Sequence, residues 1–358
     1  MKTQANKITG ANACGPRQSQ IPTGWTDASI GGPVLPVAAA ALIGLLCRAL
    51  PRLWLLLPVA LSCATPVRSQ DLLTNGLVIF FPFRGDFYDE SGYGAYASPK
   101  PATLLWDRFG APTNAVGFSG ADYAVDRVSW HPGGEVTLTY SCWVFAERIV
   151  PERQCLFSVA SFSLFGGGIL PNTRSGVALD PGSSNLFIVF TGAGNDFTSP
   201  QPVLRTNEWH HLALTKNSQA VQMFLDGELV ARGFTQSGQS VPSRGDLYIG
   251  RNGNTPGEQF YGRLDELRVY RRAFSAPEVR QLYTLEAFPR LNILREQAGL
   301  RLQALNLFVG TNYQLEISDD LLRWNDWGAP FQSSLSGSSS QLLMVTNANA
   351  FWRFRSVP

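Results

Sequence analysis

Two adjacent carboxylates stand at the start of an alternating segment. Asp265 and Glu266 open a run that continues to Tyr270. Successive side chains of a strand point to opposite faces, so Asp265 is expected to share a face with Leu267 and Val269, and Glu266 to point the other way. A carboxylate that faces an apolar core needs a hydrogen-bond donor, a basic group or a metal ion. Asp265 is therefore the residue whose partner matters most.

Two neighbouring histidines, His210 and His211, lie in an apolar run that predicts a strand. They would point to opposite faces and cannot bind one metal ion together. We expect His211, on the face of Trp209, to be structural. The chain has no cysteine and histidine spacing typical of zinc, no Gly-x-Ser-x-Gly motif and no phosphate-binding glycine loop.

The composition favours strands as the elements that position these groups. The 358 residues include 34 glycines and 23 prolines, and only 16% are charged, which suits many short strands joined by turns. Residues 77–83 are expected to form the first strand, and Asp226-Gly227 predicts a tight hairpin turn. The one convincing helix begins after Ser275, which forms a capping box with Glu278. We predict an all-β protein.

Several motifs occur in a fixed order along the chain. They are Phe-Pro-Phe at 81–83, Asp-x-Ser-Gly-x-Gly at 89–94, Trp-x-His at 209–211, Gly-x-Leu-Asp-Glu at 262–266 and Arg-Ala-Phe-Ser at 272–275. With them, residues 72–286 resemble the laminin-G-like domains of the concanavalin A-like lectin/glucanase superfamily. The resemblance implies a jelly-roll sandwich whose first and last strands run side by side.

Three segments are predicted. Residues 1–70 form a leader with a signal peptide, 71–287 the laminin-G-like domain and 288–358 a small C-terminal β-sandwich module. The last segment has alternating strands, such as 313–318 and 351–355, and a serine-rich tip at 333–340. It resembles C-terminal modules of exported bacterial proteins.

Calcium is the first ligand that the resemblance implies. Relatives often hold a structural ion between the Asp-x-Ser-Gly loop and the last strand, and calcium prefers carboxylate and carbonyl oxygens. Asp86, Asp89 and Asp265 are the candidate ligands. The alternative is that Asp89 makes a local turn with backbone amides and Asp265 caps a neighbouring backbone.

Carbohydrate is the second ligand that the resemblance implies. Relatives often bind sugars on a sheet face or loop rim, where aromatic rings stack on them. Trp106, Trp130 and Tyr261 lie near loops and are the candidate ligand-binding residues, although aromatic residues of strands more often belong to the core.

Catalysis is not expected. Glucanases of this superfamily place their carboxylates on one strand as Glu-x-Asp-x-x-Glu, and this string is absent. Glycosidases need two carboxylates roughly 5–10 Å apart, and Asp265 and Glu266 would point to opposite faces. The chain is therefore predicted not to be an enzyme.

The leader predicts export. Arg48 and Arg52 precede the apolar residues 53–62, as in a signal peptide, with cleavage after Ala64 or Ser69. An uncleaved anchor and lipidation of Cys63 are alternatives, and the polar residues 1–36 favour a start further downstream. No transmembrane span is expected in the mature chain, because no apolar run reaches about 20 residues.

Charge and cysteines follow from this division. The chain carries +2, residues 1–70 carry +5 (six basic residues against Asp27), and the remainder therefore carries 2 − 5 = −3. This gives no electrostatic case for binding nucleic acid. Cys142 and Cys155 alone lie in the mature part, on two apolar runs that look like a hairpin. We predict a disulfide between them, with two unbonded buried thiols as the alternative.

The function expected from the sequence is non-catalytic recognition of carbohydrate or a surface protein, outside the cell or at its surface. A glycan-active hydrolase or lyase and a structural envelope protein are the alternatives.

Overall fold

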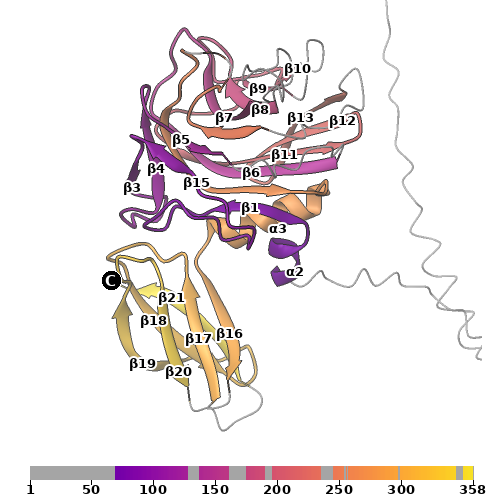
Figure 1. Cartoon of the computed structure of the whole chain (residues 1–358). Coiled ribbons are helices and arrows are strands. Elements are labelled where there is room, and N and C mark those ends of the chain that lie inside the picture. Colours follow the sequence, from indigo (N-terminus) through magenta and orange to yellow (C-terminus); the bar gives the residue numbers. More distant parts are fainter. Residues whose placement is uncertain are drawn as a thin grey trace, which may run out of the picture. The chain divides into compact units, whose positions relative to one another are not determined.

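The computed structural model describes residues 69–127, 137–160, 175–189, 196–234, 245–253, 255, 257–296, 299–343 and 350–357. The predicted signal peptide and Trp130 lie outside the described residues. Within them the chain is mostly β-structure, arranged in four antiparallel sheets, and the predicted fold class is confirmed (Figure 1).

The first sheet of the sandwich has eight strands, in the order β13-β12-β11-β6-β15-β4-β3, with β1 also paired to β15. The antiparallel pairing of β1 with β15 confirms that the first and last strands of the domain lie side by side. The strands are β1 (Leu77–Phe81), β3 (Thr103–Leu105), β4 (Ala115–Ser119), β6 (Thr137–Ala146), β11 (Trp209–Asn217), β12 (Ala220–Leu225), β13 (Glu228–Phe234) and β15 (Tyr261–Tyr270).

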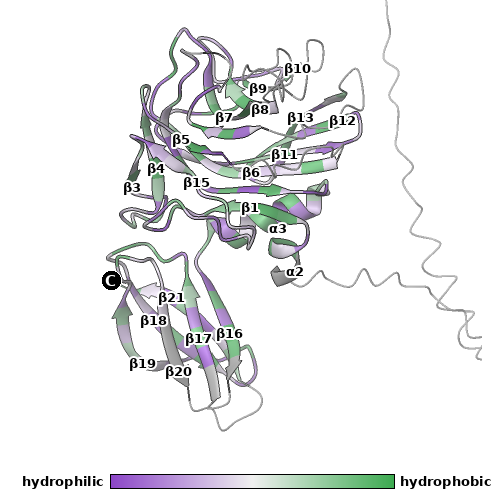
Figure 2. Ribbon diagram, in the orientation of Figure 1, coloured by the Kyte–Doolittle hydropathy of each residue, from purple (hydrophilic) through white to green (hydrophobic). Residues whose placement is uncertain are grey.

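The second sheet has seven strands, in the order β10-β9-β8-β7-β14-β5-β2. The apolar core lies between the two sheets and takes side chains from both, such as Val144 of β6 and Phe157 of β7. Figure 2 shows hydrophobic and hydrophilic residues alternating along the strands. The strands are β2 (Ser98–Lys100), β5 (Tyr123–Asp126), β7 (Gln154–Ala160), β8 (Ser175–Leu179), β9 (Leu186–Val189), β10 (Asp196–Thr198) and β14 (Asp246–Ile249).

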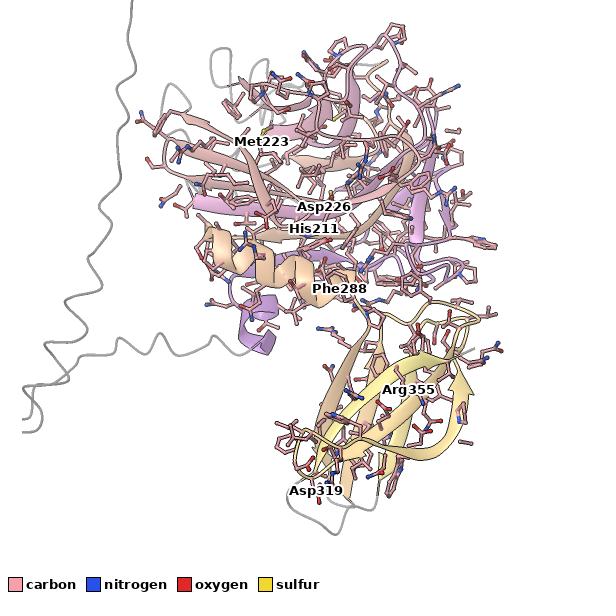
Figure 3. The ribbon with its side chains drawn as sticks, turned by 180° about the vertical axis from the view of Figure 1, so that it is seen from behind. His211, Met223, Asp226, Phe288, Asp319 and Arg355 are labelled. Carbon is pink, nitrogen blue, oxygen red and sulfur yellow. The ribbon has the colours of Figure 1, made fainter. Side chains whose placement is uncertain are left out.

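The hairpin between β12 and β13 turns at Asp226 and Gly227, as predicted. Both residues have positive φ, 50° and 79°. A two-residue turn of this kind matches the twist of the flanking strands. Asp226 also accepts a hydrogen bond from the backbone N–H of His211 at 2.8 Å, and Figure 3 shows the two residues close together.

The predicted disulfide is absent. Cys142 and Cys155 are buried thiols that form no disulfide bond. They do not belong to one hairpin, because β6 pairs with β11 and β15 whereas β7 pairs with β8 and β14 in the other sheet. The Cys155 thiol donates to the carbonyl of Val177 at 3.7 Å.

A β-bulge interrupts β15 at its two carboxylates, and here the predicted alternation was wrong. Asp265 pairs with Trp143 and Arg268 with Ser141, so two residues of β15 face one of β6. Glu266 takes up the extra length in the left-handed region, with φ of 52°. Leu264 and Leu267 both enter the core, whereas Asp265 and Glu266 both line one cavity outside it.

Two helices flank the first sheet. α2 (Ser69–Thr74) was not predicted, whereas α3 (Ala276–Ala287) was. The Glu278 carboxylate accepts from both the backbone N–H and the hydroxyl of Ser275 at 2.8 Å, which supports the predicted capping box. Val279 and Leu282 pack with Phe224 and Tyr270 against the outer face of the sheet. No helix of the described residues is long and apolar enough to cross a membrane.

The C-terminal residues form two further sheets of three strands, in the orders β16-β17-β20 and β19-β18-β21. Leu302 of β17 and Leu315 of β18 share a small core, so the sheets pack face to face as expected. The strands are β16 (Arg290–Glu296), β17 (Gly299–Leu305), β18 (Asn312–Ser318), β19 (Asn325–Gln332), β20 (Ser339–Leu343) and β21 (Phe351–Val357).

Gly262 of β15 offers a test of this packing. A Cβ atom there would lie 2.0 Å from the carbonyl oxygen of Phe145, a backbone atom that cannot swing away. We expect Gly262→Ala to destabilise the protein by about 1–3 kcal/mol or more, measured by urea unfolding. Gly182→Ala is the control, because Gly182 also has positive φ but has no atom within 4 Å of that position. An equal loss of unfolding free energy in the two variants would contradict the predicted clash.

Candidate functional site

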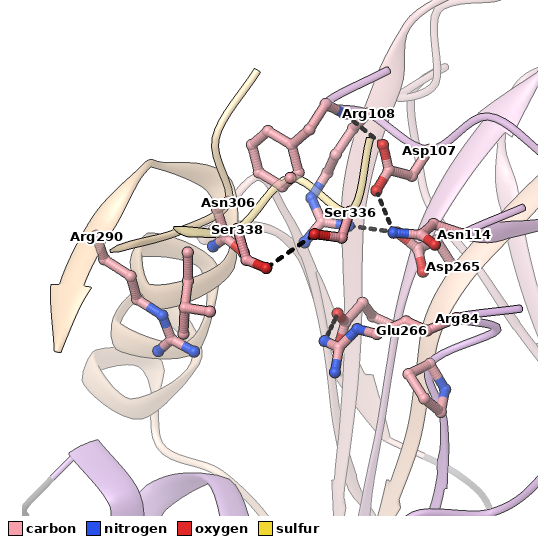
Figure 4. A pocket seen from close by; sticks show the side chains of 14 residues that line it. Arg84, Asp107, Arg108, Asn114, Asp265, Glu266, Arg290, Asn306, Ser336 and Ser338 are labelled. Carbon is pink, nitrogen blue, oxygen red and sulfur yellow. Dashed lines mark hydrogen bonds and ion pairs between the residues drawn. The ribbon is translucent and has the colours of Figure 1, made fainter. Parts of the chain in front are cut away.

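A cavity of about 350 Å³ lies beside the bulge of β15 (Figure 4). Its lining is unusually rich in charge, with three arginines and three carboxylates, and amide and hydroxyl groups complete it. The charged residues are Arg84, Asp107, Arg108, Asp265, Glu266 and Arg290. The uncharged polar residues are Asn114, Asn306, Ser336 and Ser338.

Arg108 is the partner of Asp265. Its guanidinium forms an ion pair with the carboxylate, and both side chains are almost fully buried. Arg108 lies 4.4 Å from the centre of the Trp143 ring and 4.7 Å from that of Phe109. Burial raises the pKa of Asp265 well above its ordinary value, and Arg108 only partly offsets this. The buried carboxylate of Asp265 is thus paired with a basic side chain.

Glu266 has two arginine partners. Arg84 donates to its carboxylate at 2.5 Å, and Arg268 forms an ion pair with its other oxygen. Burial opposes ionisation of Glu266, but the two guanidinium groups outweigh it and hold its pKa below the ordinary value. Glu266 is therefore ionised across the physiological range.

Arg268 carries the network on to helix α3 through an ion pair with Glu286. The other carboxylate oxygen of Glu286 accepts from Trp143 Nε1 at 2.8 Å. Burial raises the pKa of Glu286, against the effect of Arg268. A single chain of ion pairs and hydrogen bonds thus runs from Arg84 at the cavity to the inner face of the helix.

His211 lies at the inner end of this network. It is fully buried, and its Nε2 lies 2.9 Å from the hydroxyl of Ser141. Burial, followed by the nearby positive charges of Arg108 and Arg268, lowers its pKa to about 3. The ring is neutral and enclosed, which supports the structural role expected for it.

The C-terminal end of α3 is fixed by two residues of the cavity. Arg108 donates to the Glu286 carbonyl at 3.0 and 3.3 Å. Asn306 Nδ2 donates to the carbonyls of Leu285, Glu286 and Phe288 at 3.0 to 3.2 Å. The last carbonyls of a helix have no partner within it, so these bonds satisfy them and set the wall of the cavity.

The predicted metal ligands do not come together. In the described ranges, no group of three or more Asp, Glu, His or Cys side chains is arranged to hold a metal ion. Asp89 accepts from the amides of Phe80, Ser91 and Gly94 and from the Ser91 hydroxyl. This is the local turn that the sequence left as the alternative. Asp86 is exposed, and Asp265 is paired with Arg108.

Of the predicted aromatic residues, the two that the structure describes, Trp106 and Tyr261, do not line the cavity. The Trp106 side chain is 62% exposed and precedes Asp107 and Arg108 in the chain. Tyr261 lies under the guanidinium of Arg148, 4.0 Å from its ring centre, and over Gly120. Trp106 is thus free to stack on a ligand, whereas the ring of Tyr261 is already covered.

The residues that sequence reasoning missed are the basic partners and Glu286. A signal for Glu286 was present, because it continues the buried helix stripe of Val279 and Leu282 at a spacing of three and then four. An acidic residue on such a stripe indicates a buried ion pair. Arg84 directly follows the Phe-Pro-Phe motif at 81–83, but only the folded chain shows which carboxylates Arg84 and Arg108 reach.

The family of the sandwich can be stated from a sequence comparison. Residues 119–280 match the model of the family Laminin_G_3, described as the concanavalin A-like lectin/glucanases superfamily. This stretch is a laminin-G-like domain. The resemblance inferred from the motifs is thereby confirmed for these residues. No curated protein sequence matches the chain.

Solved structures with a similar fold include one domain of an arabinanase and two binding domains of toxins. Domain 4 of AbnA, an extracellular arabinanase of Geobacillus stearothermophilus in complex with arabinotriose, has 20% identity and a TM-score of 0.46; the match covers 58% of this chain and 98% of that one. The binding domain of Paraclostridial Mosquitocidal Protein 1 has 17% identity and a TM-score of 0.47, and the match covers 68% of this chain and 58% of that one. The ligand-binding domain of botulinum neurotoxin serotype D, in complex with N-acetylneuraminic acid, has 12% identity and a TM-score of 0.46. The match covers 70% of this chain and 68% of that one.

Removal of the Glu266 charge tests the network. We expect Glu266→Gln to cost about 3–5 kcal/mol near pH 7, because it leaves Arg84 and Arg268 without their shared carboxylate. The depressed pKa of Glu266 stabilises the fold above its unfolded pKa, near 4.5, and this contribution is lost as the pH falls below that value. The unfolding free energy of the variant should therefore fall less than that of the wild type between about pH 6 and pH 3.

Glu228→Gln is the matched control, since Glu228 pairs with Arg280 at the surface. The exposed pair should contribute no more than about 1 kcal/mol. Similar losses in the two variants, or an unchanged acid dependence in Glu266→Gln, would contradict the role given to the network.

Chelation tests the calcium prediction. The Asp89 carboxylate is occupied by loop donors and Asp265 by Arg108. We therefore expect the melting temperature to stay the same after EDTA and after added calcium, at constant ionic strength, as measured by calorimetry. A melting temperature that rises with calcium but not with magnesium would support the predicted calcium site.

Proposed function

We propose that this protein is an exported, non-catalytic binding module that recognises carbohydrate, and that the sugar binds in the cavity beside the bulge of β15. The observation that carries the proposal is the lining of that cavity, in which guanidinium, carboxylate, amide and hydroxyl groups converge. Neighbouring hydroxyl groups of a sugar both donate and accept hydrogen bonds, and planar guanidinium and carboxylate groups can bind them in pairs.

The dimensions of the cavity support the same proposal. About 350 Å³ is at the lower end of the range of ligand pockets, roughly 300–1,000 Å³. Phe109 and Leu305 add apolar surface to the polar lining, as the faces of a sugar ring require. The site therefore suits one or two sugar units rather than a long chain segment.

Export rests on the leader, which lies outside the described residues. The basic flank and the apolar residues 53–62 have the form of a signal peptide. We propose that the mature protein acts outside the cell or at its surface, where polymeric carbohydrate and surface proteins are the available ligands.

A glycan-active hydrolase or lyase is the second candidate, and the bulge is the observation that favours it. Asp265 and Glu266 line the same cavity, and their pKa values are shifted in opposite directions. Both carboxylates, however, are held in ion pairs with arginines. An acid or a nucleophile must reach its substrate, so we favour binding without turnover.

A glycan array with the purified full chain, combined with an assay for released reducing sugar, separates these functions. We expect binding without release. Binding should be lost in Ser336→Trp, because Ser336 is an exposed residue of the cavity rim that a large ring would extend across.

Leu335→Trp is the matched control, since Leu335 is the exposed neighbour that does not line the cavity. Release of sugar would make the protein an enzyme. Binding that survives Ser336→Trp would place the site elsewhere, and no binding to any glycan would leave a protein ligand or a structural role.

A further inference from the structure

One arginine of the cavity lacks the compensation that the others have. Arg84 and Arg108, the other arginines of the lining, each form an ion pair with a carboxylate. Arg290, at the start of β16, forms none among the described residues, and its Nε is buried without a hydrogen-bond acceptor. In Figure 4 no dashed line reaches its guanidinium.

The Arg290 side chain is half-buried, so the cost of burial falls mainly on its enclosed Nε–H group. Burial lowers the pKa of Arg290 below its ordinary value, although Glu266 and Glu286 act in the opposite direction. Burial of a charge without a partner is unfavourable, whereas an incoming anion restores the missing interaction. The group is therefore ready to bind a negative charge that the chain itself does not supply.

The surroundings of Arg290 suit an anion attached to a sugar. Ser336 and Ser338 line the same cavity and lie within 3.0 Å of each other through their hydroxyls. Hydroxyl groups rotate and can each donate to an anionic oxygen. The turn that carries them is fixed, because the N–H of Leu307 donates to the Gly337 carbonyl at 2.8 Å.

The other charged side chains of the lining already have partners. Arg84 and Arg108 are neutralised by Glu266 and Asp265, and Asp107 accepts from the amides of Phe109 and Ala111. Arg290 is then the arginine of the lining that has no ion pair among the described residues. A neutral sugar would leave it unpaired, whereas an acidic sugar would not.

We propose that the ligand of this cavity is a sugar that carries a carboxylate, and that Arg290 binds the carboxylate. The planar guanidinium fork matches a carboxylate with two parallel hydrogen bonds. This inference rests on the proposed carbohydrate-binding function and names the substrate class of the same site. The serine-rich tip, which the sequence showed without a role, supplies the neighbouring donors.

The test compares oligogalacturonate with its fully methyl-esterified form, by calorimetric titration of the full chain. The ester keeps the sugar rings and removes the charge. We expect the acid to bind about tenfold or more tightly than the ester, since hydrogen bonds between charged groups are the stronger ones. Affinity for the acid should fall as salt concentration rises.

The variants separate charge from geometry. Arg290→Gln should lower affinity for the acid about tenfold or more and affinity for the ester by a much smaller factor, and Arg290→Lys should give an intermediate loss for the acid. Arg280→Gln is the matched control, because Arg280 is an exposed arginine that pairs with Glu228. If Arg290→Gln fails to fold, the comparison of acid and ester on the wild type and Arg290→Lys still decides the question.

The outcomes distinguish this inference from the function on which it rests. Equal binding of acid and ester that is abolished by Ser336→Trp would refute the acidic ligand and keep carbohydrate recognition. Equal losses in Arg290→Gln and Arg280→Gln would also refute it. If a sulfated oligosaccharide bound more tightly than the uronate, the proposed carboxylate ligand would be wrong and a sulfated sugar would take its place. If the protein bound neither probe nor any arrayed glycan, both proposals would be refuted.

Discussion

The rest of the structure depends on a buried chain of ion pairs that joins strand β15 to helix α3. Glu266, Arg268 and Glu286 are its centre, and all three side chains are nearly inaccessible to water. Each charge costs free energy on burial, and only the partner beside it offsets that cost. The network therefore contributes more to position than to stability. It allows few alternatives for where the helix lies on the sheet, and the cavity takes its walls from that position.

The β-bulge is the local device that makes this arrangement available. In a regular strand, Asp265 and Glu266 would lie on opposite faces, and one of them would enter the apolar core. The extra residue turns both outward while Leu264 and Leu267 stay inside. The bulge lies where β15 changes its neighbour from β4 to β1. A strand with one continuous neighbour would have less freedom to change its register at this point.

Charge compensation is also the reason for which we propose recognition rather than catalysis at this site. Carboxylates held between guanidinium groups are oriented and neutralised, which suits hydrogen bonding to a ligand more than proton transfer to it. The uneven distribution of partners is informative. Arg84 and Arg108 form ion pairs within the chain, whereas Arg290 forms none among the described residues. An arginine without an ion pair, in a cavity whose other arginines have one, is the basis of the ligand chemistry that we propose.

The sequence by itself determined the strands, the hairpin at Asp226-Gly227, the capped helix and the family of the sandwich. These follow from local periodicity and turn chemistry, which act over a few residues. Only the tertiary structure decided that the face of Asp265 is not that of Leu267, that Cys142 and Cys155 lie in different sheets, and that Arg108 rather than an ion balances Asp265. The physical reason is that a bulge depends on the partner strand, and an ion pair joins side chains that 157 positions separate along the chain. No local pattern records either of them.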